Sequence, residues 1–339
     1  MSTAVRGRPL DPALAPAQPD AVEVAGLTKR FGAVTAVDGI DFTVHAGEVF
    51  AFLGPNGAGK STTINVLCTL ARPTAGVARV AGFDVATQSQ AVRRRIGLVF
   101  QEPTLDEQLT AEENLRFHAV LYRVPKAARE QRIGRVLDLV ALTDRRKDLV
   151  STFSGGMSRR LEIARGMLHT PAVLFLDEPT VGLDPQTRAL MWADVLAMRD
   201  EEGVTVFLTT HYMDEAEVAD RIAIIDDGRL VALDTPEGLK ASVGQDTVEL
   251  HTSDDASALR AIQAAGYRAT ADSSSITVFT SDGESEVGRL VTLVGGGVEL
   301  VHVRRPTIDD VFLHFTGRQI REQGGDGNST MSRAWGRRR

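Results

Sequence analysis

Residues 54 to 62, GPNGAGKST, have the types and spacing of a phosphate-binding loop. They fit the pattern G-x-x-x-x-G-K-[ST], with Gly54, Gly59, Lys60 and Ser61 in its fixed places. Glycines let backbone N–H groups approach a phosphate closely, and a helix N-terminus favours negative charge. A lysine adds a mobile cation, and a serine hydroxyl is a ligand for Mg²⁺. The alternative is a glycine turn with a solvated lysine.

The segments beside this loop favour the phosphate-binding interpretation. The apolar run Val49 to Leu53 predicts a strand, and Thr62 to Leu70 predicts the first turns of a helix. Strand, glycine-rich loop and helix start form the context that the pattern requires. The predicted cradle consists of Gly54, Pro55, Asn56, Gly57, Ala58, Gly59, Lys60, Ser61 and Thr62.

Residues 172 to 179, AVLFLDEP, place two carboxylates after an apolar run. Such a run is typical of a buried central strand, and open α/β sheets bind ligands at the carboxyl ends of their strands. We therefore expect Asp177 to hold Mg²⁺, directly or through water, and Glu178 to polarise an attacking water. Without other evidence, two adjacent acids are as typical of the start of a helix or turn as of a catalytic site. The phosphate loop in the same chain favours the catalytic interpretation.

A second candidate anion site lies just upstream, in the segment FSGGM at 153 to 157. Ser154, Gly155 and Gly156 open a predicted helix and offer a hydroxyl, unobstructed N–H groups and a positive helix end. The motif is weak by itself. Its position shortly before the strand with two acids makes it informative.

The composition of the chain limits the classes of protein to which it can belong. The chain has 339 residues, 43% of them hydrophobic, and this length suggests about two domains of an ordinary globular protein. A net charge of −7 argues against a general nucleic-acid binder. No apolar run approaches the roughly 18 residues that a membrane span needs, so any membrane role requires a partner. The single cysteine, Cys68, suggests a buried, reduced thiol.

The order of predicted elements indicates two folded units between disordered ends. Residues 1–20 read as a disordered leader and 319–339 as a disordered basic tail. Residues 21–242 begin with antiparallel strands and contain a helical subdomain at about 103–170, in which Thr110 and Glu113 form a capping box. Residues 247–318 form a smaller α+β unit whose strands and helices follow the order βαββαβ, which predicts a ferredoxin-like domain. Asp309 and Asp310 there invite a metal-site interpretation, but capping of a helix is favoured.

Six motifs occur in the order and spacing of an ATP-binding-cassette nucleotide-binding domain, which the chain resembles over about residues 21 to 240. They are GPNGAGKST, Gln101, FSGGM, VLFLDEP, GLDP at 182 to 185, and the TTH that ends at His211. The resemblance implies a P-loop α/β fold, and ATP and Mg²⁺ as cofactors. It also implies a homodimer in which each SGG segment covers the ATP held on the phosphate loop of the other copy.

The resemblance also implies roles for single residues. Gln101 resembles the glutamine that links Mg²⁺ and water to the membrane-facing surface. Asp184 resembles the residue that signals across the dimer. Asp177 and Glu178 resemble the metal-holding acid and the catalytic base, and His211 the switch that contacts the γ-phosphate. Phe31 is a candidate for stacking on adenine, although it is also typical of a core residue.

The chain departs from the family pattern at three positions. Phe153 and Met157 stand where the signature usually has Leu and Gln, and Phe31 replaces the more frequent tyrosine. Phe153 keeps an apolar anchor, whereas Met157 loses a polar side chain. Because Ser154 and glycine N–H groups are expected to contact the phosphate, we predict that turnover survives and that coupling across the dimer weakens.

The closing segment PTIDDVFLHFTGR, residues 306 to 318, is similar to the C-terminal extension of ATP-binding subunits of the daunorubicin and doxorubicin resistance type. That resemblance implies a peripheral subunit at the cytoplasmic face of the plasma membrane. It would power export of a small hydrophobic compound through a separately encoded permease. Two other functions stay open: a cassette that regulates a partner with slow turnover, and a soluble cassette acting on DNA or ribosomes. The acidic charge and the single cassette disfavour the second.

Overall fold

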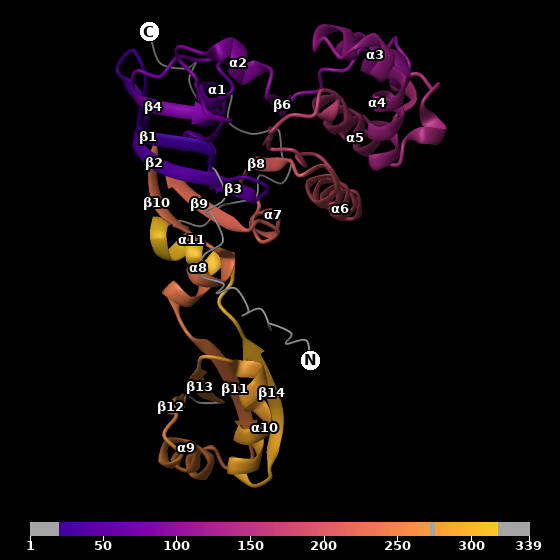
Figure 1. Ribbon diagram of the computed structural model, residues 1–339. Coiled ribbons are helices and arrows are strands. Elements are labelled where there is room, and N and C mark those ends of the chain that lie inside the picture. Colours follow the sequence, from indigo (N-terminus) through magenta and orange to yellow (C-terminus); the bar gives the residue numbers. More distant parts are fainter. Residues whose placement is uncertain (1–19, 272–274, 318–339) are drawn as a thin grey trace, which may run out of the picture.

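The structure, a computed structural model, describes residues 20–271 and 275–317 of the chain. The predicted basic tail and residues 1–19 of the predicted leader lie outside these ranges, and Asp20 already begins a strand. Figure 1 shows a larger body with a block of helices at one side and a smaller unit below it. Within the described ranges, no helix is both long enough and apolar enough to cross a membrane.

A six-stranded sheet forms the centre of the larger body, and its strand order is β10-β9-β3-β8-β7-β6. All neighbours are parallel except β10 and β9. The strands are β3 (Val49–Leu53), β6 (Ile96–Val99), β7 (Val173–Asp177), β8 (Thr205–Thr210), β9 (Arg221–Asp226) and β10 (Arg229–Asp234). Every residue of β3, β7 and β8 is buried, because parallel strands are covered on both faces. The buried central strand predicted before Glu178 is therefore confirmed.

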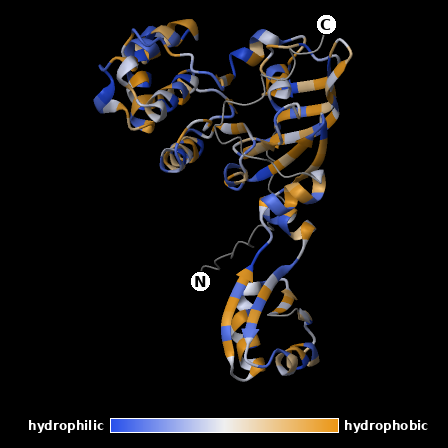
Figure 2. Cartoon of the chain, turned by 180° about the vertical axis from the view of Figure 1, so that it is seen from behind, coloured by the Kyte–Doolittle hydropathy of each residue, from blue (hydrophilic) through white to orange (hydrophobic). Residues whose placement is uncertain are grey.

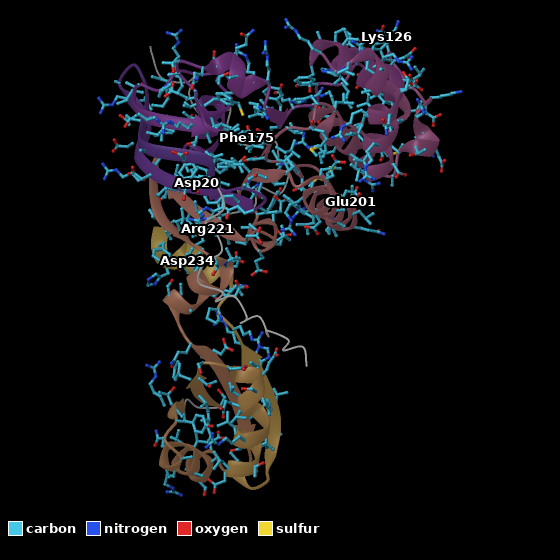
Figure 3. The ribbon with its side chains drawn as sticks, viewed as in Figure 1. Asp20, Lys126, Phe175, Glu201, Arg221 and Asp234 are labelled. Carbon is cyan, nitrogen blue, oxygen red and sulfur yellow. The ribbon has the colours of Figure 1, made fainter. Side chains whose placement is uncertain are left out.

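A four-stranded sheet of order β2-β1-β4-β5 covers one side of this sheet. It confirms the antiparallel start and consists of β1 (Asp20–Phe31), β2 (Val34–His45), β4 (Ala75–Val80) and β5 (Phe83–Asp84). Stacked rings join the two sheets: the ring centroid of Phe42 lies 5.5 Å from that of Phe50. Helix α1 (Lys60–Leu67) and the short α2 (Ser89–Arg93) complete this part. Phe175 lies between it and the helical block (Figure 3).

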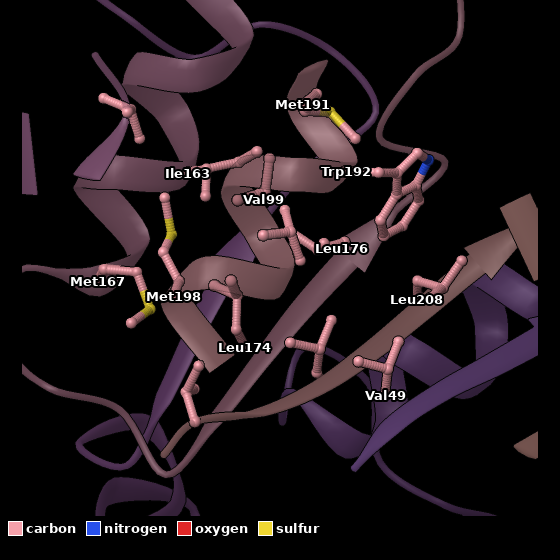
Figure 4. Close-up of a cluster of buried hydrophobic side chains, with 14 of the residues drawn as sticks. Val49, Val99, Ile163, Met167, Leu174, Leu176, Met191, Trp192, Met198 and Leu208 are labelled. Carbon is pink, nitrogen blue, oxygen red and sulfur yellow. The ribbon is translucent and has the colours of Figure 1, made fainter. Parts of the chain in front are cut away.

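The helical block consists of α3 (Ala111–Leu121), α4 (Lys126–Leu139) and α5 (Gly155–Met167), with short 3-10 turns at Thr143–Arg145 and Val150–Thr152. The predicted capping box of Thr110 and Glu113 at the start of α3 is confirmed. Helix α6 (Pro185–Glu202) follows β7. Ile163 and Met167 of α5 join Met198 of α6 and Leu174 of β7 in one buried cluster, so α5 and α6 are anchored to the central sheet (Figure 4).

The smaller unit has the predicted element order βαββαβ. It consists of β11 (Asp246–Thr252), α9 (Asp255–Ala264), β12 (Arg268–Ala271), β13 (Ile276–Thr280), α10 (Gly283–Val294) and β14 (Val298–Arg304). Its sheet has the order β12-β13-β11-β14 and is antiparallel throughout, which is consistent with a ferredoxin-like arrangement. Figure 2 shows hydrophobic and hydrophilic residues alternating along these strands, as expected for a sheet with one covered face.

The last described helix, α11 (Ile308–Thr316), returns to the larger body and lies against α8 (Pro236–Val243) (Figure 1). Its residues Ile308, Val311 and Phe312 are buried in the same cluster as α5 and α6. The sequence-based boundary grouped this helix with the smaller unit. The connection from the smaller unit back to the larger body is short, because the first strand of the unit, β11, and its last strand, β14, are neighbours. The points where the chain enters and leaves the unit therefore lie next to each other. Asp310 forms a capping box with Thr307, which confirms the favoured capping role.

Candidate active site

Three candidate segments begin at one edge of the central sheet. Strands β3, β8 and β7 are parallel neighbours, and the register pairs Leu53 with Thr210 and Asp177 with Thr209. The phosphate loop, the second acid and the histidine follow these strand ends directly. The chain therefore brings the phosphate loop next to Glu178 and His211, which follow it by more than a hundred residues, at the edge where open α/β sheets bind ligands.

Lys60 is the first residue of α1 and is almost completely buried. Its Nζ donates to the carbonyl oxygens of Gly54 at 2.8 Å and Pro55 at 3.1 Å. Its third neighbour is Glu178, whose Oε1 lies 3.1 Å from Nζ. Burial lowers the pKa of Lys60, and the charge of Glu178 acts in the opposite direction. An entering phosphate would therefore compete with Glu178 for this ammonium group.

Glu178 stands at the centre of the site, and its backbone has a φ of 46°, a left-handed value that is uncommon outside glycine. Its N–H donates to both the carbonyl and the hydroxyl oxygen of Thr209, which holds this conformation. Burial alone would raise the pKa of the carboxyl, but His211 and Lys60 outweigh burial and lower it. Glu178 is therefore held as a carboxylate, the form that a general base needs.

Gln101 and His211 both approach the second oxygen of Glu178. The Nε2 of Gln101 donates to Oε2 at 3.3 Å, and Nδ1 of His211 lies 3.4 Å from the same oxygen. Strand β6 ends at Val99, so Gln101 lies in the loop that follows this strand. All three predicted catalytic side chains meet at one carboxylate.

The candidate metal ligands offer oxygen atoms side by side. Ser61 Oγ donates to Oδ1 of Asp177 at 3.3 Å, and Thr209 Oγ1 donates to the same oxygen at 2.6 Å. Mg²⁺ prefers oxygen ligands and is usually held by one or two protein groups together with substrate phosphates and water. A hydroxyl next to a carboxylate beside the phosphate loop fits that preference. Gln101 contacts Glu178 and has no described contact with these two ligands.

A pocket of about 360 Å³ lies over the phosphate loop. Its lining residues are Ala36, Asn56, Gly57, Gly59, Lys60, Ser61, Thr62, Gln101 and Glu178. Gly59 is required at this position, since its φ is 111° and a Cβ would lie 2.5 Å from the carbonyl oxygen of Ala36. The helix beginning here has no side-chain cap, so its first N–H groups remain available to an anion.

The remaining predicted residues lie outside this pocket. Phe31 is 54% exposed, and the ammonium of Lys29 lies 4.6 Å from the centroid of its ring. Ser154 caps α5 by accepting from Met157 N, and Asp184 caps α6 by accepting from Thr187 N. The predicted roles of Ser154 and Asp184 depend on a second copy of the chain, so these roles stay predictions.

The glycines of the SGG segment pack against the start of α6. A Cβ on Gly156 would lie 2.3 Å from Cγ2 of Thr187, so this position has no room for a larger residue. Phe153 and Met157 are partly buried against the cluster that joins α5 and α6 to the sheet. Both departures from the signature pattern thus supply apolar packing at the N-terminus of α5.

Comparison with known proteins agrees with this geometry. A family model described as ABC transporter matches residues 37–181. The daunorubicin resistance ATP-binding protein DrrA2 of Streptomyces coeruleorubidus is 42% identical over 309 residues, which cover 88% of this chain and 96% of that protein. The chain belongs to the ABC transporter family. As an ABC transporter ATPase, it binds and hydrolyses ATP.

Other ABC proteins share the architecture. The Nod factor export ATP-binding protein I of Ralstonia nicotianae is 37% identical over 308 residues, covering 89% of this chain and 95% of that protein. An ATP-binding cassette solved as a dimer with ADP and Pi in a post-hydrolysis state has a TM-score of 0.57 and 27% identity. That match covers 63% of this chain and 98% of the solved one. The predicted P-loop ABC fold is therefore confirmed.

Two residues position the ABC site in a role that the sequence did not predict. Thr209 accepts from Glu178 N and donates to Asp177, so it fixes both acids. Arg159 of α5 is buried, and its guanidinium donates to the carbonyl oxygen of Pro179 at 2.6 Å and to Glu162 at 2.9 Å. Thr209 entered the sequence analysis only as part of the TTH motif, without a role of its own, and an arginine in a helix is common, so the sequence assigned neither residue a positioning role.

Proposed function

We propose that this ABC ATPase powers export of a small hydrophobic compound through a separately encoded membrane permease, as a homodimer with Mg-ATP at its interface. The observation that carries the proposal is the match along 96% of the length of a daunorubicin resistance ATP-binding protein, which includes the smaller C-terminal unit. On this proposal the protein is peripheral and works at the cytoplasmic face of the plasma membrane.

In the proposed mechanism, the loop N–H groups and Lys60 hold the phosphates of ATP. Phosphate binding releases Lys60 from Glu178, so the carboxylate is free to orient and polarise the attacking water. Ser61 and Asp177 would hold Mg²⁺, which neutralises charge on the phosphates when bound. His211 stays beside Glu178, and Ser154 to Gly156 of the second copy cover the γ-phosphate. Phe31 would carry the adenine ring.

The proposed permease docks in a cleft between the helical block and the central sheet. This cleft, of about 280 Å³, is lined by Cys68, Leu70, Arg93, Ile96, Leu98, Phe100, Thr104, His118, Tyr122 and Arg165. Leu70 and Phe100 are 55% and 38% exposed, and large exposed apolar side chains at a cleft favour a protein partner. Phe100 is the neighbour of Gln101, which contacts Glu178, so a permease segment seated here lies close to the catalytic carboxylate.

We expect Leu70→Asp to uncouple transport from hydrolysis. A buried, unpaired carboxylate at the contact would lower stimulation of ATPase activity by the permease at least about tenfold. Basal activity would stay unchanged, because Leu70 does not contact the nucleotide pocket. Leu300→Asp on β14 is the matched control, since Leu300 is also 55% exposed. Equal stimulation of the Leu70 variant and the wild type would contradict docking in this cleft.

The export proposal is tested in inside-out vesicles that contain the purified protein and a candidate membrane permease from the same organism. We expect ATP-dependent uptake of a fluorescent anthracycline, and none with Glu178→Gln. ATP hydrolysis without uptake of any hydrophobic compound tested would refute the export proposal while leaving the ATPase assignment intact.

A further inference from the structure

A buried carboxylate outside the nucleotide pocket supports the segment that carries His211. Glu215 lies in the short helix α7 (Met213–Ala216) and is 1% exposed. Its Oε2 accepts from Thr210 Oγ1 at 2.6 Å, and the same hydroxyl oxygen accepts from Tyr212 N at 2.9 Å. Thr210, before His211, is therefore bonded directly to this carboxylate, and Tyr212, after His211, is linked to it through the Thr210 hydroxyl.

The other oxygen of Glu215 faces the first turn of α6. Oε1 is buried without a hydrogen bond, and the nearest described cationic atom is Nε of Arg188 at 3.7 Å, which is also buried without a hydrogen bond. The guanidinium of Arg188 lies 4.3 Å from the ring centroid of Tyr212, and its Nη1 donates to Asp214 at 3.1 Å. A small shift between α6 and α7 would turn the opposed donor and acceptor into a charge-assisted hydrogen bond.

Arg188 connects this carboxylate to the part of the chain that is expected to face a second copy. Its backbone N–H donates to the carbonyl oxygen of Asp184 at 2.9 Å, and Asp184 caps the helix through Thr187. Thr187 in turn fills the space beside Gly156 of the SGG segment. A continuous set of contacts therefore runs from the His211 segment through Glu215 and Arg188 to the proposed dimer face.

We propose that Glu215 and Arg188 are a pair of positioning residues that hold the His211 segment and the first turn of α6 in the relative position that ATP hydrolysis requires. This inference rests on the proposed roles of His211 and Asp184. The pair contacts neither the phosphate loop nor the pocket, so it acts on turnover and not on nucleotide affinity. Burying a carboxylate that is only partly paired costs stability, and such a cost is typical of a functional site.

The titration of Glu215 gives a second readout. Burial raises its pKa to about 7, while Thr210 and Arg188 act in the opposite direction. Three other titratable groups lie around Glu215: Asp214 on the same helix, His211 after β8, and Asp309 of α11, which interacts with Asp214. Strand β3 also packs against α7, and it contains no charged residue. Because the folded pKa lies above the usual 4.5, the charged carboxylate destabilises the protein as pH rises from 4.5 to 7.

The experiment compares Glu215→Gln, Arg188→Gln and the double variant with the wild type at pH 8, measuring kcat, the Kd for ATP and Tm. We expect each single variant to lower kcat by about tenfold to 100-fold, as displacement of catalytic groups does. The Kd should change less than about twofold, and the double variant should be no slower than the slower single variant. Arg199→Gln, in the last turn of α6, is the matched control and should keep wild-type kcat.

Two further measurements separate positioning from simple structural support. Glu215→Gln removes a destabilising charge, so its Tm at pH 8 should equal or exceed that of the wild type while kcat falls. Below pH 7, protonation of Glu215 should bring the wild-type kcat toward that of Glu215→Gln. Three results would each overturn the pairing. They are wild-type kcat in both single variants, multiplied effects in the double variant, and a loss of kcat in Glu215→Gln that follows a lower Tm.

The Glu178→Gln variant distinguishes a failure of the proposed Glu215 and Arg188 pair from a failure of the proposed function. If Glu178→Gln is inactive while the Glu215 and Arg188 variants turn over normally, only the pair is refuted. If Glu178→Gln hydrolyses ATP at the wild-type rate, the proposed mechanism itself fails, and the inference fails with it.

Discussion

Replacing Glu178 by Gln is expected to reduce ATP hydrolysis by at least about 100-fold while ATP still binds. The carboxylate is the point where Lys60, Gln101 and His211 meet, and an amide of the same size cannot accept a proton from water. Affinity for ATP should be equal or higher, because the variant lacks the negative charge that competes with phosphate for Lys60. Single-turnover kinetics and calorimetry measure the two quantities separately.

The same variant tests the proposed dimer. With hydrolysis blocked, ATP should hold two copies together, and light scattering after size exclusion should report twice the mass of the chain. Glu201→Gln is the matched control, because Glu201 is an exposed glutamate near the end of α6, where it pairs with Arg135 (Figure 3). A Glu178→Gln protein that stays monomeric in saturating ATP would contradict the sandwich arrangement.

Replacing Lys60 by Ala is expected to weaken ATP binding by at least about tenfold to 100-fold, the value of one or more hydrogen bonds between charged groups. Lys60 is the only lysine that lines the described nucleotide pocket, and it is held toward the loop carbonyls. Isothermal titration with ATP measures the loss. Lys126→Ala is a matched control, since Lys126 is also the first residue of a helix but lies on the outer side of the helical block (Figure 3).

Lys60→Ala should also destabilise the nucleotide-free protein. It leaves Glu178 buried beside His211 without its ammonium partner, and an unsatisfied buried group costs about 1–3 kcal/mol or more. Adding Glu178→Gln to Lys60→Ala should recover part of this loss, because the uncompensated charge disappears. Chemical denaturation of both variants gives the comparison. Unchanged ATP affinity in Lys60→Ala would contradict the assignment of the phosphate site.

Local patterns in the sequence predicted the parts of the site that depend on backbone conformation and strand order. The glycines of the phosphate loop, the buried strand before Glu178, the capping box at Thr110 and the helix cap at Asp310 each use residues within one short segment. The meeting of Glu178 with the loop also followed from the sequence, because parallel strands end at one edge of a sheet.

Contacts between distant elements were decided only by the tertiary structure. Arg159, Thr209 and the pair of Glu215 and Arg188 act through partners on other elements, and their residue types are common in helices and strands. The return of α11 to the larger body likewise depends on which apolar surface of the fold is left to cover, and local periodicity does not carry that information. The sequence by itself therefore determined the loop, the acids and the fold class. The tertiary structure decided which buried charged groups hold them in place, because burial and charge pairing depend on what packs around a residue and not on its neighbours in the chain.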